Sequence, residues 1–595
     1  MSRKRTQKQK RLLAAASAAP ATPAPVPQPV TATRRAPVAP RLESILTATW
    51  FLPTVLGLAA LLRVANVLLL RGTPFVDDLQ LDHRYYDEWA RRIVHGDWAG
   101  GTGPFWVDPL YAYFLALLYA IFGRSLLLVR LVQAGLGVAT CGLAARLGQR
   151  VSGSAAVGNL AALLIAIFIP AVYYDGTLEK TTLSLVLFTG ALVLYFDGSL
   201  RSALWSGVLL GFAVLTRGNL LLFVVLGAIA LAMERTSDAR MRALAFIAGA
   251  LAIVGVATVR NVLVGGELVP TTANFGQNLY VGQACTIGDG SYGCSFVRLD
   301  PEFEQGDFRD EAERRLGRKL GAAELSAYWR GQAVQAMFAD PGAAVTRGWH
   351  NLRLFFHEYE NSDNHNLGAQ AESSPVLALP VLWMGQLFPL AVLGAVVSWR
   401  RDRARRLLAG MVAVYCASML PLMVFARYRT TMLPCMAVLA ATGVLWLAET
   451  VRRGDWAIAG RAAALVVPCA LFSLVWPGWM ATAYAKSMAV SYHDMGEFYL
   501  AAGKQDDAIQ AYERAVAMAP DTVIASMRRL GDLYRQRKQY DRAERQMLGV
   551  LQRKPDSPLG RRALVQLYTD MAADPRYRDD DSVRAKLARA RAAVN

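Results

Sequence analysis

The feature that most constrains this chain is a series of long apolar runs that recurs through most of its 595 residues. Each run has roughly the length that a helix needs to cross a hydrocarbon core about 30 Å thick, at about 1.5 Å per residue. With 54% hydrophobic residues, the chain is too apolar for a soluble protein of this size. The sequence therefore predicts an all-α membrane protein with about eleven spans, at residues 45–70, 105–122, 126–147, 157–173, 178–196, 204–233, 243–264, 376–397, 407–425, 432–447 and 457–481.

The run at 204–233 is open to two interpretations, because the polar stretch Thr216-Arg217-Gly218-Asn219 interrupts it. It is either one broken helix or two short helices, and the choice decides on which side the later loops lie. Counted as one crossing from a cytoplasmic N-terminus, it places the loops 71–107 and 265–375 and the C-terminal region outside. The Arg-rich connections at 400–406 and 452–461 then lie inside, as the positive-inside bias requires. Two crossings would move the loop 265–375 inside, so we favour one.

The formal net charge of +18 is distributed in keeping with this topology. Much of it lies in the N-terminal tail and in short connections between spans, where basic residues orient a membrane protein. The charge therefore indicates topology, and no nucleic-acid partner is predicted. Residues 1–44 are rich in Ala, Pro and Arg without periodicity and are predicted to be a disordered basic tail, which precedes a membrane domain at 45–484.

A helical repeat with an offset of 35 residues occupies the C-terminal region, 485–595. Gly496, Tyr499, Gly503, Ala508, Tyr512, Ala515 and Pro520 are followed by Gly531, Tyr534, Ala543 and Pro555. Small residues let two antiparallel helices approach closely, aromatic side chains fill the space between them, and Pro ends the second helix. The pattern resembles the tetratricopeptide repeat (TPR) and predicts an α-solenoid that binds a protein partner or acceptor. A helical hairpin without a partner is the alternative.

Two of the six cysteines stand apart from the others. Cys285 and Cys294 flank a polar, Gly-rich segment, whereas the other four lie within apolar runs. If the loop 265–375 faces an oxidising compartment, a Cys285–Cys294 disulfide is expected. The same loop contains a predicted helical stretch at about 311–339, so it is expected to form a small domain on the membrane surface.

The loop between the first two spans carries more acidic and aromatic residues than a turn requires. Asp77, Asp78, Asp82 and Asp108 lie in or beside it, together with a dense set of Tyr and Trp residues. Crowded carboxylates at a membrane face cost repulsion and desolvation, which favours a functional site. The alternative is a solvated loop with an amphipathic surface helix at 85–94, for which Asp82 supplies the N-cap.

Several motifs, in order and spacing, resemble GT-C membrane glycosyltransferases. The group that they resemble most is the family 39-type group, which contains protein O-mannosyltransferases and the aminoarabinose transferases of lipid A. These motifs are Asp82 with Tyr86, Gly96-Asp97-Trp98, Asp108-Pro109-Leu110-Tyr111, Tyr173-Tyr174-Asp175-Gly176, Glu179, Arg260-Asn261 and Arg427-Tyr428-Arg429.

This resemblance covers roughly residues 45–450. It implies a GT-C bundle that transfers a hexosyl or pentosyl unit from a polyprenyl-phosphate donor, with inversion. The acceptor, on the outer face, is protein, glycan or lipid. The implied location is a bacterial inner membrane, with the TPR region extracytoplasmic.

The resemblance also implies roles for the acids. It places the catalytic general base at Asp82, since a hydroxyl acceptor needs a carboxylate within hydrogen-bond reach. Asp108 is expected to orient the sugar or acceptor, and Asp77 and Asp78 are alternatives to Asp82. Glu179 matches an acidic family position, but simple alternation of the spans places it near the cytoplasm. Either a helix before it fails to cross fully, or Glu179 is structural.

Arginines at the outer ends of spans are candidates to hold the donor phosphate, because a guanidinium fork suits phosphate geometry. Arg427 and Arg429 are the first choice and Arg260 the second, and the alternative for each is an arginine that snorkels to the interface. Tyr86 is included with Glu179 among the implied substrate-binding residues. Arg130 and Arg217 lie within apolar runs, where they line the cavity or lock spans together.

The sequence indicates no cofactor. The histidines show no metal-binding spacing, so no metal site is predicted, although some related transferases use divalent cations. No nucleotide-sugar site, Rossmann glycines or P-loop is present. The rival hypothesis is a non-catalytic membrane scaffold in which the TPR region performs the function. The combination of Asp82, Asp108 and the Arg427–Arg429 pair in one chain favours the enzyme.

Overall fold

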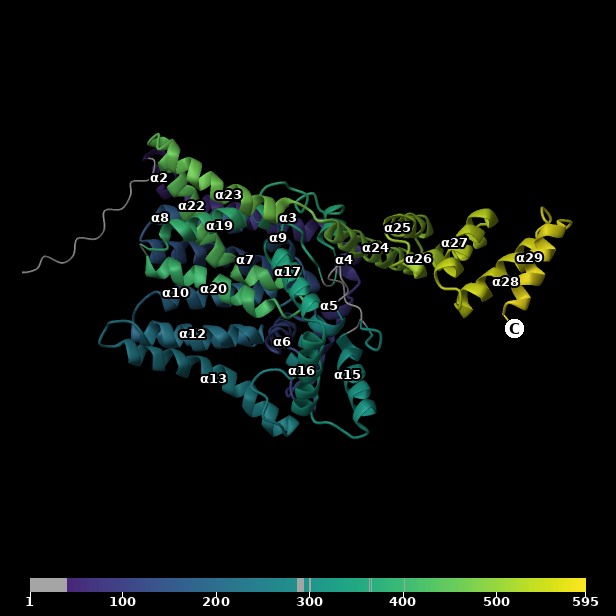
Figure 1. Ribbon diagram of the computed structural model, residues 1–595, viewed down its shortest axis with the longest axis horizontal. Coiled ribbons are helices and arrows are strands. Elements are labelled where there is room, and N and C mark those ends of the chain that lie inside the picture. Colours follow the sequence, from purple (N-terminus) through teal and green to yellow (C-terminus); the bar gives the residue numbers. More distant parts are fainter. Residues whose placement is uncertain are drawn as a thin grey trace, which may run out of the picture.

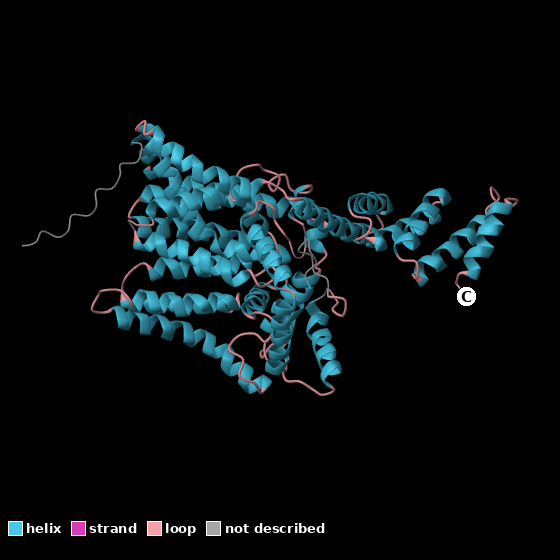
Figure 2. Cartoon of the chain, viewed as in Figure 1, coloured by secondary structure: helices cyan, strands magenta, loops and turns pink. Residues whose placement is uncertain are grey.

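The computed structural model describes residues 40–285, 294–298, 301–362, 364, 366–400 and 402–594, without the side chains of Pro40 and Asp77. Most of the tail predicted at 1–44 therefore lies outside the described residues. Within these ranges the chain is helical and forms no β-strand beyond one isolated bridge between Phe168 and Leu382 (Figure 2). The predicted all-α fold is confirmed.

A bundle of apolar helices makes up the larger part of the molecule (Figure 1). Its members are α3 (Phe51–Leu69), α7 (Leu126–Ser152), α8 (Ala155–Ala166), α10 (Thr181–Tyr195), α11 (Leu200–Val214), α12 (Leu221–Ala232), α13 (Ala239–Gly265), α19 (Met384–Ser398), α20 (Arg403–Met419), α22 (Leu433–Arg452) and α23 (Trp456–Leu474). Five segments are long and apolar enough to cross a membrane: α3, α7, α13, Ala426–Arg452 and α23. The others are shorter, and the protein is a multi-pass membrane protein.

The two ends of the bundle differ. We call the end with α5 (Leu81–Val94) and the C-terminal helices the site end, and the end with α2 (Pro40–Thr47) and the connection 233–238 the opposite end (Figure 1). The helix α2 is fixed at the opposite end because Asn159, in α8, donates to the carbonyl of Leu46 at 2.7 Å.

The predicted span at 105–122 is wrong, because α6 (Leu110–Phe122) begins and ends at the site end of the bundle. At its start, the backbone N–H of Leu110 donates to the carbonyl of Leu215. Near its end, Tyr119 donates to Asp87 of α5 at 2.7 Å. The helix lies across the direction of its long neighbours and packs on α5 (Figure 1).

The run at 204–233 forms two helices, so the prediction of one crossing is also wrong. The helix α11 ends at Val214, and the chain turns back through a 3-10 turn at Gly218–Leu220 into α12. The loss of one crossing at 105–122 and the gain of one at 204–233 offset each other, so the later segments keep their predicted sides. The loop 265–375 thus stays at the site end, as expected, whereas the stretch between α6 and α11 changes sides. Glu179 therefore lies at the site end.

The loop 265–375 is largely helical. It contains α14 (Phe275–Tyr280), α15 (Pro301–Leu316), α16 (Ala322–Ala339), α17 (Pro341–Phe356) and α18 (Leu367–Ala371). The stretch predicted at 311–339 is thus two helices, which are separated at Gly317, a residue with a φ of 68°. A disulfide joins Cys285 to Cys294, with Cα atoms 4.6 Å apart, beside a core around Trp329 and Phe308.

The C-terminal region forms the expected antiparallel helices and projects from the site end (Figure 1). They are α24 (Gly478–Ala501), α25 (Gln505–Met518), α26 (Ile524–Gln536), α27 (Tyr540–Arg553), α28 (Pro558–Ala573) and α29 (Asp581–Ala592). The small residues act as expected: a side chain at Gly496 would lie 2.5 Å from the ring of Tyr512. The helix α24 also packs on α4 (Pro74–Asp77) and α18, which joins this region to the bundle.

Candidate active site

The helix α5 positions Asp82 at the mouth of the bundle. Its buried face carries Tyr86, Trp89, Ala90 and Ile93 and packs on α6, so its direction is fixed by apolar contacts. Asp82 lies in the first turn, and the N-cap is Gln80. A carboxylate in this position is stabilised by the helix dipole. The Asp82 side chain keeps 20% of its exposure, so a ligand can reach it.

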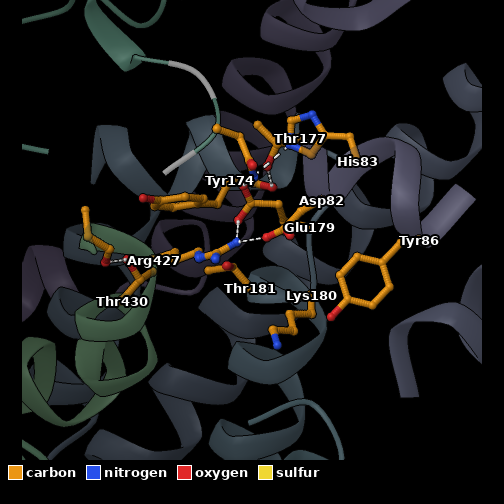
Figure 3. Close-up of polar contacts among 12 residues, drawn as sticks. Asp82, His83, Tyr86, Tyr174, Thr177, Glu179, Lys180, Thr181, Arg427 and Thr430 are labelled. Atoms are coloured by element: carbon orange, nitrogen blue, oxygen red, sulfur yellow. Dashed lines mark hydrogen bonds and ion pairs between the residues drawn. The ribbon is translucent and has the colours of Figure 1, made fainter. Parts of the chain in front are cut away.

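Arg427 lies between two carboxylates that are far apart in the sequence. It belongs to the short helix α21 (Ala426–Arg429), and its Nη1 lies 2.5 Å from Oδ2 of Asp82 and 3.7 Å from Oε2 of Glu179. Figure 3 shows both acids directed at this guanidinium. Nη2 of Arg217 donates to the backbone carbonyl of Arg427 at 2.7 Å and to Thr181 at 3.1 Å. Arg217 thereby holds the backbone at Arg427 in place.

Glu179 lies in the connection between α9 (Ile169–Asp175) and α10, and is buried. Asn364 donates to its Oε1 at 2.8 Å, and Nε2 of His83 lies 3.4 Å from the same atom. Burial opposes ionisation, but the charge of Arg427 and the contacts with His83 and Asn364 hold the pKa of Glu179 below its usual range. The side chain is therefore a fixed anion beside Arg427.

Lys180 and Asp108 form a second ion pair next to the first. Nζ of Lys180 contacts Oδ2 of Asp108, and the backbone N–H of Gly218 donates to Oδ1 at 3.1 Å. Desolvation lowers the pKa of Lys180 from its ordinary value, against the opposing effect of Asp108. The hydroxyl of Tyr86 lies 3.5 Å from the carbonyl of Asp108, which places Tyr86 beside the same ion pair. No role for Lys180 is predicted from the sequence, although Lys180 directly follows Glu179 between apolar runs.

The other two predicted phosphate ligands bind protein atoms. Arg429 is fully buried and donates to the carbonyls of Leu354, His357 and Tyr359 and to Glu360. Arg260 donates to the carbonyls of Ala99, Gly101 and Gly103, and its guanidinium lies 4.0 Å from the ring centroid of Phe105. Both therefore secure loops at the site end, and the structure does not bring either into the Asp82–Arg427 contact.

Buried polar contacts hold the connection that carries Glu179 and Lys180. Arg63 of α3 pairs with Asp175 at 2.6 Å, and Thr182 donates to the same carboxylate at 2.7 Å. Arg130 donates to the carbonyls of Gly176 and Val76. Buried guanidinium groups in an apolar bundle require such partners. These contacts fix the turn between α9 and α10 and so the position of Glu179.

The described residues contain no group of three His, Cys, Asp or Glu side chains that could hold a metal ion. What they assemble is a polar site with three carboxylates and three cations, from elements that are distant in the sequence: Asp82, Asp108, Glu179, Lys180, Arg217 and Arg427. Carboxylates can accept a proton, and guanidinium and ammonium groups can hold a phosphate.

Fold and site define a multi-pass helical membrane protein with a charged site at one end of its bundle and a TPR region beside it. Residues 104–260 match the family described as dolichyl-phosphate-mannose-protein mannosyltransferase, and residues 487–553 match the tetratricopeptide repeat. The resemblance seen in the sequence is thus confirmed. The first match includes Asp108, Glu179 and Lys180, whereas Asp82 and Arg427 lie outside it. A search of curated proteins finds no match to the chain.

Two solved structures are partly similar. One is the oligosaccharyltransferase of Archaeoglobus fulgidus in complex with Zn and sulfate, with a TM-score of 0.35 and 16% identity over 76% of this chain and 57% of that chain. The other is ArnT of Cupriavidus metallidurans bound to undecaprenyl phosphate, with a TM-score of 0.36 and 14% identity over 79% of this chain and 76% of that chain. This chain thus spans little more than half of the length of the oligosaccharyltransferase.

Proposed function

We propose that this protein is a membrane glycosyltransferase that moves a monosaccharide from a polyprenyl-phosphate donor to an acceptor at the site end of the bundle. The observation that carries the proposal is the contact of Arg427 with both Asp82 and Glu179, next to the Lys180–Asp108 pair. A site for this reaction needs a carboxylate base and a cationic phosphate cradle within one substrate's reach. The family match over residues 104–260 supports the choice of a sugar linked to a lipid phosphate.

In the proposed reaction, the acceptor oxygen bonds to the anomeric carbon as its proton passes to a carboxylate oxygen of Asp82. The bond between the anomeric carbon and the phosphate oxygen breaks, and the phosphate leaves with the electron pair. The acceptor attacks from the opposite face, so the anomeric centre is inverted. Arg427 and Lys180 offset the charge that develops on that phosphate. Without substrate, Arg427 pairs with Asp82, so an arriving phosphate competes for the guanidinium and releases the carboxylate.

The remaining groups position Asp82, Arg427 and Lys180. Glu179 fixes the guanidinium of Arg427 from its other side, and Asp108 holds Lys180. The TPR region, which begins beside the site, is proposed to hold a protein acceptor, and the side that bears the site is proposed to be the extracytoplasmic side of a bacterial inner membrane.

The purified chain in lipid vesicles tests the proposal when it is supplied with an extract of cells that lack the chain, as the source of acceptor, and with a radiolabelled polyprenyl-phosphate sugar or the corresponding nucleotide sugar. We expect the lipid-linked sugar to be consumed and the nucleotide sugar to remain. Cells that lack the chain are expected to accumulate the lipid-linked donor. If neither donor is consumed and no lipid-linked sugar accumulates, while the TPR region still captures a partner, the scaffold alternative is correct.

A further inference from the structure

A cavity lies in the half of the bundle that is remote from the candidate active site. Its volume is about 270 Å³, and its walls come from α10, α11, α12, α13 and α20. The walls are mostly aromatic and aliphatic, with Phe188, Leu192, Leu210, Phe223, Phe246 and Met411 among the lining residues. Tyr195 and Phe196, at the end of α10, place the cavity next to the opposite end of the bundle.

The few polar groups in the wall already have partners within the protein. The Ser206 hydroxyl donates to the carbonyl of Ala191 at 2.8 Å, and the Tyr195 hydroxyl donates to the carbonyl of Gly227 at 2.8 Å. The interior thus offers an occupant few groups for hydrogen bonds, which favours hydrocarbon there. The adjacent face of α12 is apolar and exposed at Val225, Leu226 and Ile229, so hydrocarbon from a bilayer meets a continuous apolar surface.

The rim of this cavity is positively charged. Arg406 is exposed, lines the cavity and donates through Nη1 to the carbonyl of Trp399 at 2.9 Å. Among the described residues no carboxylate pairs with it. Nearby, Arg405 pairs with Asp402, while Arg403 and Arg242 share Glu234 at 3.6 and 2.8 Å. Four arginines thus face two acids, and an excess of positive charge remains beside an apolar cavity.

We infer that this cavity is a binding site for one anionic phospholipid. An acyl chain would lie between α10, α12 and α20, with the phosphate at Arg406. Basic pockets between helices at the level of the headgroups suit anionic lipids, because a guanidinium binds a phosphate oxygen through charge-assisted hydrogen bonds. The polar groups of the candidate active site lie at the other end of the bundle, so this lipid is not the sugar donor.

Native mass spectrometry of the full chain, released from nanodiscs of phosphatidylglycerol or phosphatidylcholine, tests the inference. The wild type is expected to retain one phosphatidylglycerol and at least fivefold less phosphatidylcholine. Arg406→Gln should lose this selectivity. Arg461→Gln is the matched control, because Arg461 is an exposed arginine near the start of α23, outside the cavity, and should behave like the wild type.

A second variant tests the acyl-chain site without a change in charge. A Cβ at Gly410 would meet nothing within 4 Å, and Gly410 lines the cavity, so Gly410→Leu is expected to extend a side chain into this space. Retention of phosphatidylglycerol is expected to fall at least fivefold. Equal retention of both lipids by the wild type, or unchanged retention in Arg406→Gln and Gly410→Leu, would overturn the inference. Displacement of phosphatidylglycerol from the wild type by equimolar polyprenyl phosphate would also overturn it.

Discussion

In the proposed mechanism Arg427 has two functions, and the same atom, Nη1, performs both. Its Nη1 contacts Asp82 and Glu179, so in the absence of substrate it neutralises the proposed base, and with substrate it is proposed to hold the donor phosphate. Because Glu179 stays in place through Asn364, the guanidinium keeps one anchor when Asp82 is released. In this proposal the Asp82–Arg427 pair couples the arrival of the donor to the availability of the base.

Arg427→Lys should weaken donor binding with little effect on folding. A lysine keeps the charge but loses the planar fork that matches phosphate geometry. We expect the KM for the lipid donor to rise roughly tenfold, which corresponds to about 1.4 kcal/mol, with the KM for the acceptor nearly unchanged. Arg452→Lys, in a surface ion pair with Glu449, is the control and should leave both constants unchanged. A normal donor KM in Arg427→Lys would argue against Arg427 as a phosphate ligand.

Arg260→Ala should lower stability instead of donor affinity. The guanidinium donates to three carbonyls of the loop 99–103, and their loss should cost roughly 1–3 kcal/mol of unfolding free energy. The unfolding midpoint in detergent and the donor KM of the folded fraction separate the two roles. A tenfold higher donor KM with an unchanged midpoint would return Arg260 to the substrate site.

At the residue scale, much of the site could be predicted from the sequence. The structure brings together Asp82, Asp108, Glu179 and Arg427, all of which the motifs singled out. The sequence could not distinguish Arg427 from Arg429, two residues away. Positions two apart in a helix face different directions, and only packing shows that Arg429 points to buried carbonyls.

At the element scale, two segments were mispredicted from hydropathy. Hydropathy indicates that a segment prefers apolar surroundings, but it does not give the direction in which the helix runs relative to the bundle. The helix α6 is apolar throughout, yet its ends are held at the site end by Leu215 and Asp87. The interruption around Arg217 was visible, but only its contacts with Thr181 and Arg427 show that the chain reverses there.

The junction between α24 and the loop before α5 is expected to respond to pH. Burial, together with the negative charges of Asp78 and Glu497, raises the pKa of Asp494 to about 7. The folded chain therefore keeps a proton that the unfolded chain loses near pH 4. This contribution to stability is fully present below about pH 4 and is lost as the pH rises to about 7.

The unfolding midpoint at pH 5 and at pH 8 measures this effect. The wild type should lose more stability between these values than Asp494→Asn, which mimics the protonated acid at both. Asp532→Asn is the control, since Asp532 lies on α26 and pairs with Arg528. An identical decline in the wild type and Asp494→Asn would contradict the assignment.

At the scale of the whole molecule, one segment connects the site to the C-terminal region. Asn364 donates to Glu179 in the site, and Asn366 donates to Ser487 of α24 at 2.9 Å. Further along, Glu372 accepts hydrogen bonds from Tyr492 and Arg514. The TPR region is therefore attached next to the site, and in the proposed function a protein acceptor bound to it would meet the donor there.

The side of the membrane can be tested with a thiol reagent that does not cross it. In a variant without native free cysteines, Gln335→Cys on α16 should react in intact spheroplasts, whereas Ser237→Cys should react only after lysis. Both positions are exposed and lie at different ends of the bundle. The reverse pattern would place the site in the cytoplasm.

The most direct test of the central claim is the transfer rate of Asp82→Asn, measured with saturating lipid-linked donor and compared with Glu88→Gln. Glu88 is an exposed acid on the same helix, so its substitution controls for the loss of charge. General-base catalysis contributes roughly 10²–10⁴-fold, and we predict a loss of that size in Asp82→Asn, with donor binding retained and Glu88→Gln unaffected. Transfer at the full rate by a correctly folded Asp82→Asn protein would contradict the account.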